Sequence, residues 1–234
     1  ETFAQLKQLN QSLSLHTVCE EAHCPNQSEC WSKGTATFMV LGKTCTRGCK
    51  FCQINSSVKG DFVDENEPQK IVEAAKKLGL EYVVLTMVNR DDLPDQGAAH
   101  VANCISQLKE NRFLVEALVG DFQGNEKWID LVCQAQPRVF AHNIETVKSL
   151  QGKVRDARAT YEQSLHVLKS AREKGMDYTK SSIQVGHGET KEEVLQTLQD
   201  LRAAGVNMVT LGQYLQPSSW HLPVEKYYSP EEFS

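Results

Sequence analysis

Hydrophobic residues follow two different spacings along the chain, and these spacings alternate. Short runs rich in β-branched and aromatic residues predict six strands, at residues 37–41, 82–86, 113–118, 137–142, 179–185 and 208–212. Longer stretches with helical spacing lie between them, at residues 67–79, 95–110, 126–134, 161–174 and 190–204. A further short amphipathic helix is expected at residues 2–12. The chain is therefore predicted to alternate strands with helices over most of its length.

This alternation predicts the fold class. Strands separated by helices are typical of a parallel sheet whose faces are covered. Six repeats fall short of the eight that close a TIM barrel, so we expect an α/β fold, an open partial (βα)6 TIM-like barrel. Residues 1–36 are expected to form an N-terminal extension and residues 37–234 the barrel, together making one compact unit. Thr190, with Glu193 three residues later, predicts a capping box on the last helix.

Composition limits the classes of partner. The 234 residues carry a net charge of −5, which argues against nucleic acid as the main partner. No apolar run approaches the ~20 residues of a membrane span, so no membrane association is expected. The chain lacks an initiator Met and ends where a helix is beginning, so we interpret both ends as incomplete.

Cysteine is the most informative residue type. Six of the eight cysteines form two triplets, Cys19, Cys24 and Cys30 (CxxxxCxxxxxC) and Cys45, Cys49 and Cys52 (CxxxCxxC). Eight cysteines would permit four disulfides, but such scaffolds are typical of small secreted domains without βα alternation. The other two, Cys104 and Cys133, stand alone in predicted helices, where buried packing is expected.

The CxxxCxxC triplet follows the first predicted strand and suits a metal cluster. Soft thiolates gathered this closely favour an iron–sulfur cluster or zinc. In a [4Fe–4S] cluster three thiolates leave one iron without a protein ligand, and an open metal position can bind a substrate. The spacing, with Phe51 before the last cysteine, resembles the radical SAM superfamily. In that superfamily S-adenosylmethionine (SAM) chelates the free iron, and one electron cleaves its sulfonium to give a 5′-deoxyadenosyl radical.

The CxxxxCxxxxxC triplet leaves two interpretations open. A structural zinc site would need a fourth ligand, and His23 lies between the first two cysteines. Because the second triplet lies so close in sequence, we favour a second iron–sulfur cluster. Pro25 and Asn26 are turn formers that would let the three thiolates converge.

Polar residues and glycines follow the predicted strands. In parallel α/β folds the carboxyl ends of the strands form the site, so these residues are expected at one rim with the cysteine loop. Each also has a purely structural interpretation. Asn143 with Glu145 would be a helix cap, and Gly186 with Gly188 a plain turn. Residues 90–92 would be a solvated charge run, and the histidines at 142 and 187 would be satisfied by hydrogen bonds.

Several motifs together resemble the lipoyl synthase family. The two triplets, about fifteen residues apart, carry the resemblance with Gly34–Met39, Val83–Thr86, Arg90–Asp95, His142–Thr146 and Gly212–Ser218. The resemblance implies insertion of two sulfur atoms into an octanoyl chain on a lysine of a lipoyl carrier protein. It implies two [4Fe–4S] clusters and SAM as cofactors. A ferredoxin- or flavodoxin-type electron donor and a monomeric enzyme are also expected.

The resemblance also assigns roles to residues. Cys45, Cys49 and Cys52 would hold the SAM cluster, and Cys19, Cys24 and Cys30 an auxiliary cluster that supplies the sulfur. Asn143 and Glu145 match the ribose-binding position of the family. The other residues expected to contact SAM are Phe51, Thr86, Gly186, Gly188 and Gln213.

The chain departs from the family pattern at four places. It stops before the C-terminal Arg-Ser-Ser-Tyr motif whose serine completes the auxiliary cluster in the family. Asn89 replaces an aspartate, His187 replaces an apolar residue, and Lys50 occupies a position that a smaller residue often holds. None of these changes touches a cysteine.

Two other functions remain open at this stage. One is another radical SAM sulfur-inserting enzyme or maturase with a different acceptor, and the other is a non-catalytic zinc or iron–sulfur interaction protein. Thiolate clusters imply a reducing compartment, which would be the cytoplasm, or an organelle matrix if a transit peptide has been removed.

Overall fold

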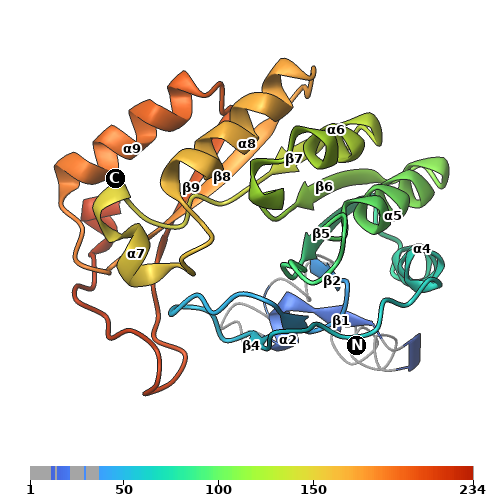
Figure 1. Cartoon of the computed structure of the whole chain (residues 1–234), viewed down its shortest axis with the longest axis horizontal. Helices are drawn as coiled ribbons and strands as arrows, with labels where there is room; N and C mark the ends of the chain where they lie inside the picture. Colours follow the sequence, from blue (N-terminus) through green and yellow to red (C-terminus); the bar gives the residue numbers. More distant parts are fainter. Residues whose placement is uncertain (1–11, 14, 22–28, 30–36, 234) are drawn as a thin grey trace.

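A curved, mostly parallel sheet forms the frame of the structure (Figure 1). The computed structural model describes residues 12–13, 15–21, 29 and 37–233 of the chain. The sheet order is β1-β2-β5-β6-β7-β8-β9, in which β2 to β9 are parallel and β1 is antiparallel to β2. The bounds are His16–Thr17 (β1), Thr37–Val40 (β2), Tyr82–Met87 (β5), Leu114–Leu118 (β6), Val139–Ala141 (β7), Thr179–Val185 (β8) and Met208–Gln213 (β9). All six predicted strands form, side by side in chain order, and the predicted partial α/β barrel is confirmed.

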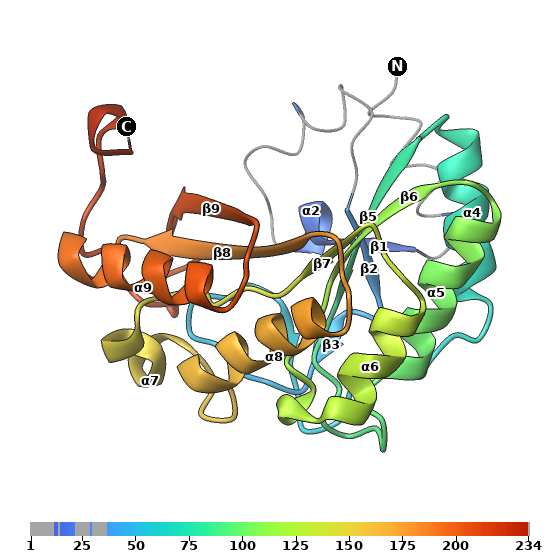
Figure 2. The ribbon, with the colours of Figure 1, turned by 90° about the horizontal axis from the view of Figure 1, so that it is seen from above.

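Helices cover the outer face of the sheet (Figures 1 and 2). The five long helices are α4 (Glu67–Lys77), α5 (Ala98–Glu110), α6 (Glu126–Gln134), α8 (Tyr161–Glu173) and α9 (Lys191–Ala203). Each of these helices connects two neighbouring parallel strands. Three connections contain further short elements: β3 (Thr44–Cys45) and β4 (Asn55–Ser56) precede α4, η1 (Phe122–Gly124) precedes α6, and η2 (Lys148–Leu150) and α7 (Gln151–Val154) precede α8. Near the chain's ends lie α2 (Val18–Glu21) and η3 (Pro230–Phe233). In the described residues β1 and β9 are the two edges, so the barrel stays open.

The start of α5 differs from the prediction. A helix from residue 95 was expected, but α5 begins at Ala98 because Gln96 and Gly97 both have positive φ. The Asp95 carboxylate accepts hydrogen bonds from the backbone N–H groups of Gly97 and Ala99. Asp95 therefore caps the helix instead of opening it. The helix predicted at residues 2–12 lies outside the described residues except for Ser12.

Two buried clusters stabilise the barrel. The larger joins the strands of the N-terminal half to α4, α5 and α6, and its fully buried side chains include Phe38, Phe122 and Phe140. The smaller joins β8 to α8 and α9 around Leu168, Ile183 and Leu201. Burial of Cys104 and Cys133 in the larger cluster confirms their expected packing role.

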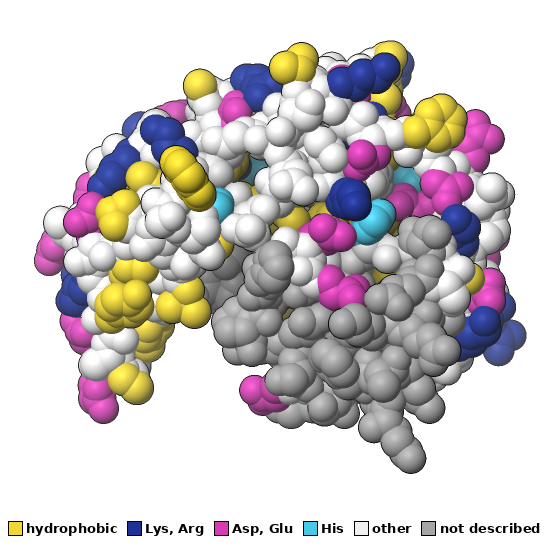
Figure 3. Space-filling model, turned by 90° about the horizontal axis from the view of Figure 1, so that it is seen from below, with side chains coloured by type: hydrophobic (Ala, Val, Ile, Leu, Met, Phe, Trp, Pro, Cys, Tyr) yellow, Lys and Arg dark blue, Asp and Glu magenta, His cyan; other side chains and the backbone are white. Residues whose placement is uncertain are grey.

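The N-terminal extension joins the sheet where it is described. His16 and Thr17 pair with Met39 and Phe38, and the Thr17 residue is fully buried. Positive and negative side chains are interspersed on the face seen in Figure 3, and hydrophobic side chains gather on the lobe at its left. No helix among the described residues is long and apolar enough to cross a membrane.

The capping box on α9 forms as predicted and gives a stability test. The Thr190 hydroxyl accepts the N–H of Glu193, and the Glu193 carboxylate accepts the N–H of Thr190. Thr190→Ala should lower the free energy of unfolding in urea by about 1 kcal/mol, because the N–H of Glu193 loses the hydroxyl that accepts its hydrogen bond. Lys191→Ala, at the first helical position, is the matched control and should change it little. Equal effects of the two substitutions would contradict the role assigned to the cap.

Candidate functional site

A cavity of about 540 Å³ opens at the carboxyl ends of the strands. Every parallel strand or the residue after it contributes to its lining, through Met39, Thr86, Leu118, His142, Gln184 and Gln213. The three cysteines of the CxxxCxxC motif line the same space. The cavity therefore lies where a parallel α/β fold places its site.

The loop that carries these cysteines runs between two short strands, β3 (Thr44–Cys45) and β4 (Asn55–Ser56). We call residues 45–52 the cluster loop. Its backbone is fixed by distant segments, because Thr46 N–H donates to the Asn89 carbonyl (2.8 Å) and Lys50 N–H to the Val154 carbonyl (2.9 Å). Gly48 N–H donates to the Asp156 carboxylate (2.9 Å).

The thiols of the loop fit a cluster that takes three ligands. Cys45, Cys49 and Cys52 are free and half-buried. Backbone N–H groups point at two of the sulfurs, from Arg47 to Cys45 Sγ and from Asp156 to Cys49 Sγ, each at 3.4 Å. Burial raises the pKa of Cys52 to about 12 and also raises that of Cys49. A bound metal replaces the thiol proton and so removes this penalty.

A buried arginine within the cluster loop, Arg47, anchors the loop to the segments that carry Asp91 and Asp121. The Arg47 guanidinium donates two hydrogen bonds to Asp91 (3.0 and 2.9 Å) and two to Asp121 (2.5 and 2.8 Å). Burial alone would raise the pKa of both carboxyls, but Arg47 outweighs it and holds both pKa values below their usual range. Arg90 is buried too and bonds to Asp92 and to the Leu41 carbonyl. The solvated charge run considered for residues 90–92 is therefore wrong.

Asn143 and Glu145 line the cavity and do not cap a helix. Glu145 has φ +67°, and its backbone is held by Ser182 O and Gln184 N on β8. Its carboxylate accepts from the Gln184 side chain (3.1 Å) and bonds the Asn143 side chain. Burial raises the pKa of Glu145, and nearby Arg155 opposes that rise. Because the next helical turn starts only at Lys148, the interpretation as a helix cap is wrong.

Arg155 lines the cavity, although no local pattern in the sequence marks it as a site residue. It follows α7, and its Nη1 donates to Ser164 Oγ (2.8 Å) and Gln151 Oε1 (3.2 Å). Its Nε is buried and has no hydrogen-bond partner among the described residues. A buried donor without a partner is costly, so this N–H is poised for a ligand that accepts a hydrogen bond.

His142 is satisfied within the protein, as expected. Its two ring nitrogens bond to the Val119 carbonyl (2.9 Å) and to Ser164 Oγ (3.0 Å). Burial and the charge of Arg155 lower the pKa of His142 to about 4, so the ring is neutral at physiological pH. It is a fixed, uncharged part of the wall.

The loop after β8 fits the turn interpretation of its two glycines, and their expected contact with SAM stays a prediction. Gly186 and Gly188 have φ of +113° and +104°, and neither glycine is among the residues that line the cavity. Gln213 does line the cavity and packs on Gly186. His187 is buried between the rings of Phe51 (centroids 6.5 Å apart) and Tyr214 (4.2 Å). Both of its nitrogens lack partners in the described part of the chain, so the expectation of a hydrogen-bonded His187 is wrong.

The first cysteine triplet falls largely outside the described residues. Cys24 and Cys30 are not described, and of Cys19 only the backbone, in α2, is described. Its neighbour Val18 lines the cavity, so this segment reaches the same mouth. The ligand role of the triplet stays a prediction.

Comparisons with known proteins identify the family. Residues 39–201 match the model of the radical SAM superfamily. A lipoyl synthase from Anaeromyxobacter sp. is 51% identical over 99% of this chain and 80% of its own length, and one from Thermus thermophilus is 52% identical over 99% and 72%. The chain belongs to the lipoyl synthase family. A mitochondrial lipoyl synthase of Vitis vinifera is 50% identical over 99% of this chain and 61% of its own.

Solved structures agree on the fold. Methylornithine synthase superposes with a TM-score of 0.64 at 16% identity, covering 97% of this chain and 67% of its own. The FeFe-hydrogenase maturase from Carboxydothermus hydrogenoformans gives 0.67 at 13% identity, with 99% and 53% covered. Membership of the lipoyl synthase family confirms the predicted radical SAM enzyme class and its cofactors, SAM and two [4Fe–4S] clusters.

We call Arg47 and its two carboxylate partners, Asp91 and Asp121, the Arg47 network. Removing one of these carboxylates should lower the stability of the folded protein. Asp121→Asn should lower the free energy of unfolding at pH 7 by about 3 kcal/mol, because the buried guanidinium loses the charge of one partner. A carboxyl with a depressed pKa stabilises the fold above its unfolded-state pKa, about 3.9, and the stabilisation is lost as the pH falls through the folded-state pKa. The variant should therefore show a weaker loss of stability between about pH 5 and pH 2 than the parent.

Urea unfolding at a series of pH values measures both the free energy of unfolding at pH 7 and its dependence on pH. Asp130→Asn, on the exposed side of α6, is the matched control and should reproduce the parental pH dependence. If Asp121→Asn and Asp130→Asn gave the same curve, the Arg47 network would not be what stabilises the loop.

Proposed function

We propose that this enzyme inserts two sulfur atoms into the octanoyl chain of a lipoyl carrier protein, with the described cavity as its SAM site. The observation that carries the proposal is that the three cysteines of the CxxxCxxC motif share one cavity with Asn143, Glu145 and Arg155. The chain's identity of about half its residues to lipoyl synthases supports the choice of reaction.

Cys45, Cys49 and Cys52 would hold the [4Fe–4S] cluster that binds SAM. When bound, the cluster supplies one electron to the sulfonium of SAM, which gives methionine and a 5′-deoxyadenosyl radical able to take a hydrogen atom from the acyl chain. An unactivated C–H bond is beyond acid–base catalysis by side chains, so this chemistry must come from the cofactors. The protein's own task is to bind, orient and exclude water.

Polar groups of the cavity suit the polar parts of SAM. The Glu145 carboxylate and the Asn143 amide can accept and donate hydrogen bonds to ribose hydroxyls. The Nε–H of Arg155, which lacks a partner among the described residues, would donate to the SAM carboxylate. Phe51, Thr86 and Gln213 line the same cavity and would contact the remainder of the molecule.

Apolar side chains would exclude water and receive the acyl chain. Met39, Met87, Val88, Leu118 and Val119 line the cavity beside the cysteines. A dry, shaped wall protects a reactive radical from side reactions and holds the chain in line with it. Cys19, Cys24 and Cys30 would hold the auxiliary cluster that donates sulfur, at the mouth that Val18 reaches.

The partners and the compartment follow from this chemistry. We assign the enzyme a one-electron protein donor of the ferredoxin or flavodoxin type and a monomeric state. We also assign it a reducing compartment, because thiolate clusters do not persist under oxidising conditions. Relatives include mitochondrial and apicoplast lipoyl synthases, so an organelle matrix is consistent with the family.

Substitutions in each cysteine triplet should distinguish the roles of the two triplets. Replacing Cys45, Cys49 and Cys52 by Ala should abolish SAM cleavage, because the cluster that binds SAM loses its ligands. Replacing Cys19, Cys24 and Cys30 by Ala should leave abortive SAM cleavage but abolish sulfur insertion. Cleavage is measured as 5′-deoxyadenosine formed, and insertion by mass spectrometry of an octanoylated carrier peptide. The matched control replaces Cys104, which is buried in the core, by Ala and should retain both reactions.

Two outcomes would contradict this proposal. Loss of SAM cleavage in the Cys19, Cys24 and Cys30 variant would argue against separate roles for the triplets. Cleavage of SAM by the parent enzyme without any gain of sulfur by the octanoylated peptide would favour another acceptor.

Arg155 should recognise the carboxylate of SAM. Arg155→Lys should weaken equilibrium binding of SAM about tenfold, because a charge-assisted hydrogen bond of about 1.5 kcal/mol is lost. Binding of decarboxylated SAM should be unchanged, since it lacks the group that Arg155 would contact. Arg138→Lys, at the opposite end of the strands, is the control. Equal weakening for both ligands would show that Arg155 acts only on the fold.

A further inference from the structure

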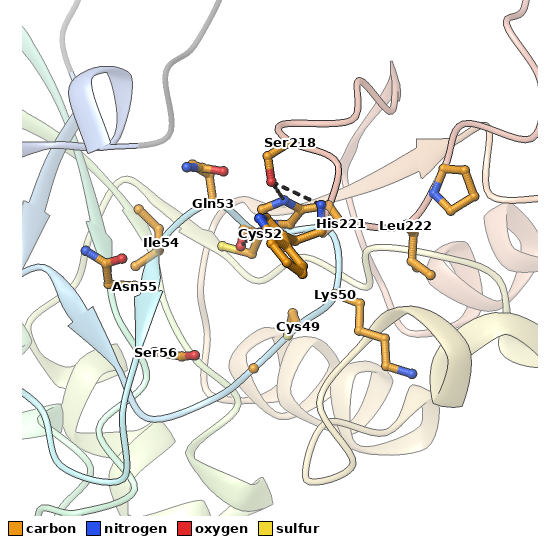
Figure 4. A pocket seen from close by; sticks show the side chains of 13 residues that line it. Cys49, Lys50, Cys52, Gln53, Ile54, Asn55, Ser56, Ser218, His221 and Leu222 are labelled. Atoms are coloured by element: carbon orange, nitrogen blue, oxygen red, sulfur yellow. Dashed lines mark hydrogen bonds between the residues drawn. The ribbon is translucent and has the colours of Figure 1, made fainter.

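A second cavity, of about 610 Å³, lies against the other side of the cluster loop (Figure 4). Cys49 and Cys52 belong to the linings of both cavities. We call the 540 Å³ cavity the inner cavity and the 610 Å³ cavity the outer cavity. Between Cys49 and Cys52 successive side chains face opposite sides, because Lys50 lines the outer cavity and Phe51 the inner one. The loop is therefore a thin wall with the predicted SAM site on one side and this outer cavity on the other.

A C-terminal segment, residues 218–223, forms the opposite wall of the outer cavity. It is tied to the backbone of the cluster loop, since the His221 ring bonds to the Cys52 carbonyl (3.1 Å) and Leu222 N–H donates to the Lys50 carbonyl (3.2 Å). The Ser218 hydroxyl bonds to the other ring nitrogen of His221 (2.8 Å; Figure 4). Trp220 lies on this segment and is 94% exposed, although it lines the cavity.

The outer cavity has a local charge opposite to that of the whole chain. Lys50 is the one charged side chain among the described residues that line it, and no carboxylate in the described part of the chain pairs with it. The flanking cations Lys153 and Arg158 are paired with Glu225 and Asp156. The chain as a whole carries −5. The rim of the outer cavity therefore presents an unpaired positive charge beside an exposed aromatic ring.

Three reactants must reach the same cluster. SAM and the acyl chain both enter the inner cavity, and the inner cavity must exclude water while the radical exists. An electron has to arrive while SAM occupies that cavity. A donor that docked at the inner mouth would compete with the acyl carrier, whereas one at the outer cavity would not.

We propose that the outer cavity is the docking site of the electron donor, an acidic protein that carries an exposed one-electron prosthetic group. This inference rests on the proposed function. Trp220 would provide the apolar contact and Lys50 the charge complementarity that selects an acidic partner. In each transfer the donor loses one electron and the cluster held by the three cysteines gains it; no bond forms or breaks and no proton moves.

Comparing a chemical reductant with a protein reductant distinguishes an effect of a substitution on donor docking from an effect on catalysis. The reconstituted holoenzyme is assayed for SAM cleavage with dithionite, which needs no docking site, and with enzymatically reduced flavodoxin. Trp220→Ala and Lys50→Gln should keep dithionite-driven rates within about twofold of the parent and lose about tenfold in flavodoxin-driven rate at limiting flavodoxin, as for a typical interface hot spot. Only Lys50→Gln should also weaken the dependence of the flavodoxin-driven rate on ionic strength.

Matched controls lie far from the outer cavity. Leu114→Ala, at the opposite end of the strands, and Lys169→Gln, on the exposed face of α8, should behave as the parent with both reductants. Flavodoxin-driven rates that are unchanged in both Trp220→Ala and Lys50→Gln would overturn the docking site. Absence of dithionite-driven cleavage in the parent would instead overturn the proposed function.

Binding gives a readout that does not depend on activity. Oxidised flavodoxin should bind Trp220→Ala about tenfold more weakly than the parent in equilibrium titration. A zero-length carbodiimide cross-link should join flavodoxin carboxylates to Lys50 and not to Lys169, as mapped by mass spectrometry. If an octanoylated carrier domain cross-linked to Lys50 and displaced flavodoxin, the outer cavity would be the carrier's site and the proposal would be wrong.

Discussion

The position of the cluster loop depends on one buried guanidinium. Arg47 lies two residues from both Cys45 and Cys49, the predicted cluster ligands, so its ion pairs fix the backbone that carries both thiols. Its partners, Asp91 and Asp121, come from the segments that follow β5 and β6. A buried charge is tolerated only when its partners are in place, so the loop can take this position only after the sheet has formed. The fold thus presents the three thiols together before any metal is bound.

The cavity above the loop is arranged for a ligand with both charges and hydroxyl groups. His142 is held neutral, while the Glu145 carboxylate and the Arg155 guanidinium lie in the same wall. Glu145 reaches this place with φ +67°, a costly conformation for a residue with a side chain. Its backbone bonds to β8 compensate for that cost. Strain of this kind is typical of positions where a side chain must be aimed at a ligand.

In the proposed reaction, electron supply and radical protection would place opposite demands on the same cluster. An electron donor must approach closely, whereas the radical must be kept from water. A loop whose successive side chains face opposite cavities meets both demands with few residues. On the inner side the Phe51 ring packs edge-on against His187, which in turn packs on Tyr214, and Lys50 faces outward next to Phe51. The bonds from His221 and Leu222 to the loop backbone stiffen this wall from outside.

The sequence by itself determined the strand order, the cluster loop and the cap at Thr190, because each depends on residues close together in the chain. Strand periodicity and the CxxxCxxC spacing are local patterns, and βα connections place consecutive strands side by side. Tertiary structure alone decided that Arg155 lines the cavity, that Arg47 joins the loop to the sheet and that the loop has a second, outer cavity. Arg47 and Asp121 are 74 residues apart, and His221 bonds to the carbonyl of a residue 169 positions earlier. Such contacts exist only once the strand ends have been brought to one rim, and no local pattern records which distant side chains will meet there.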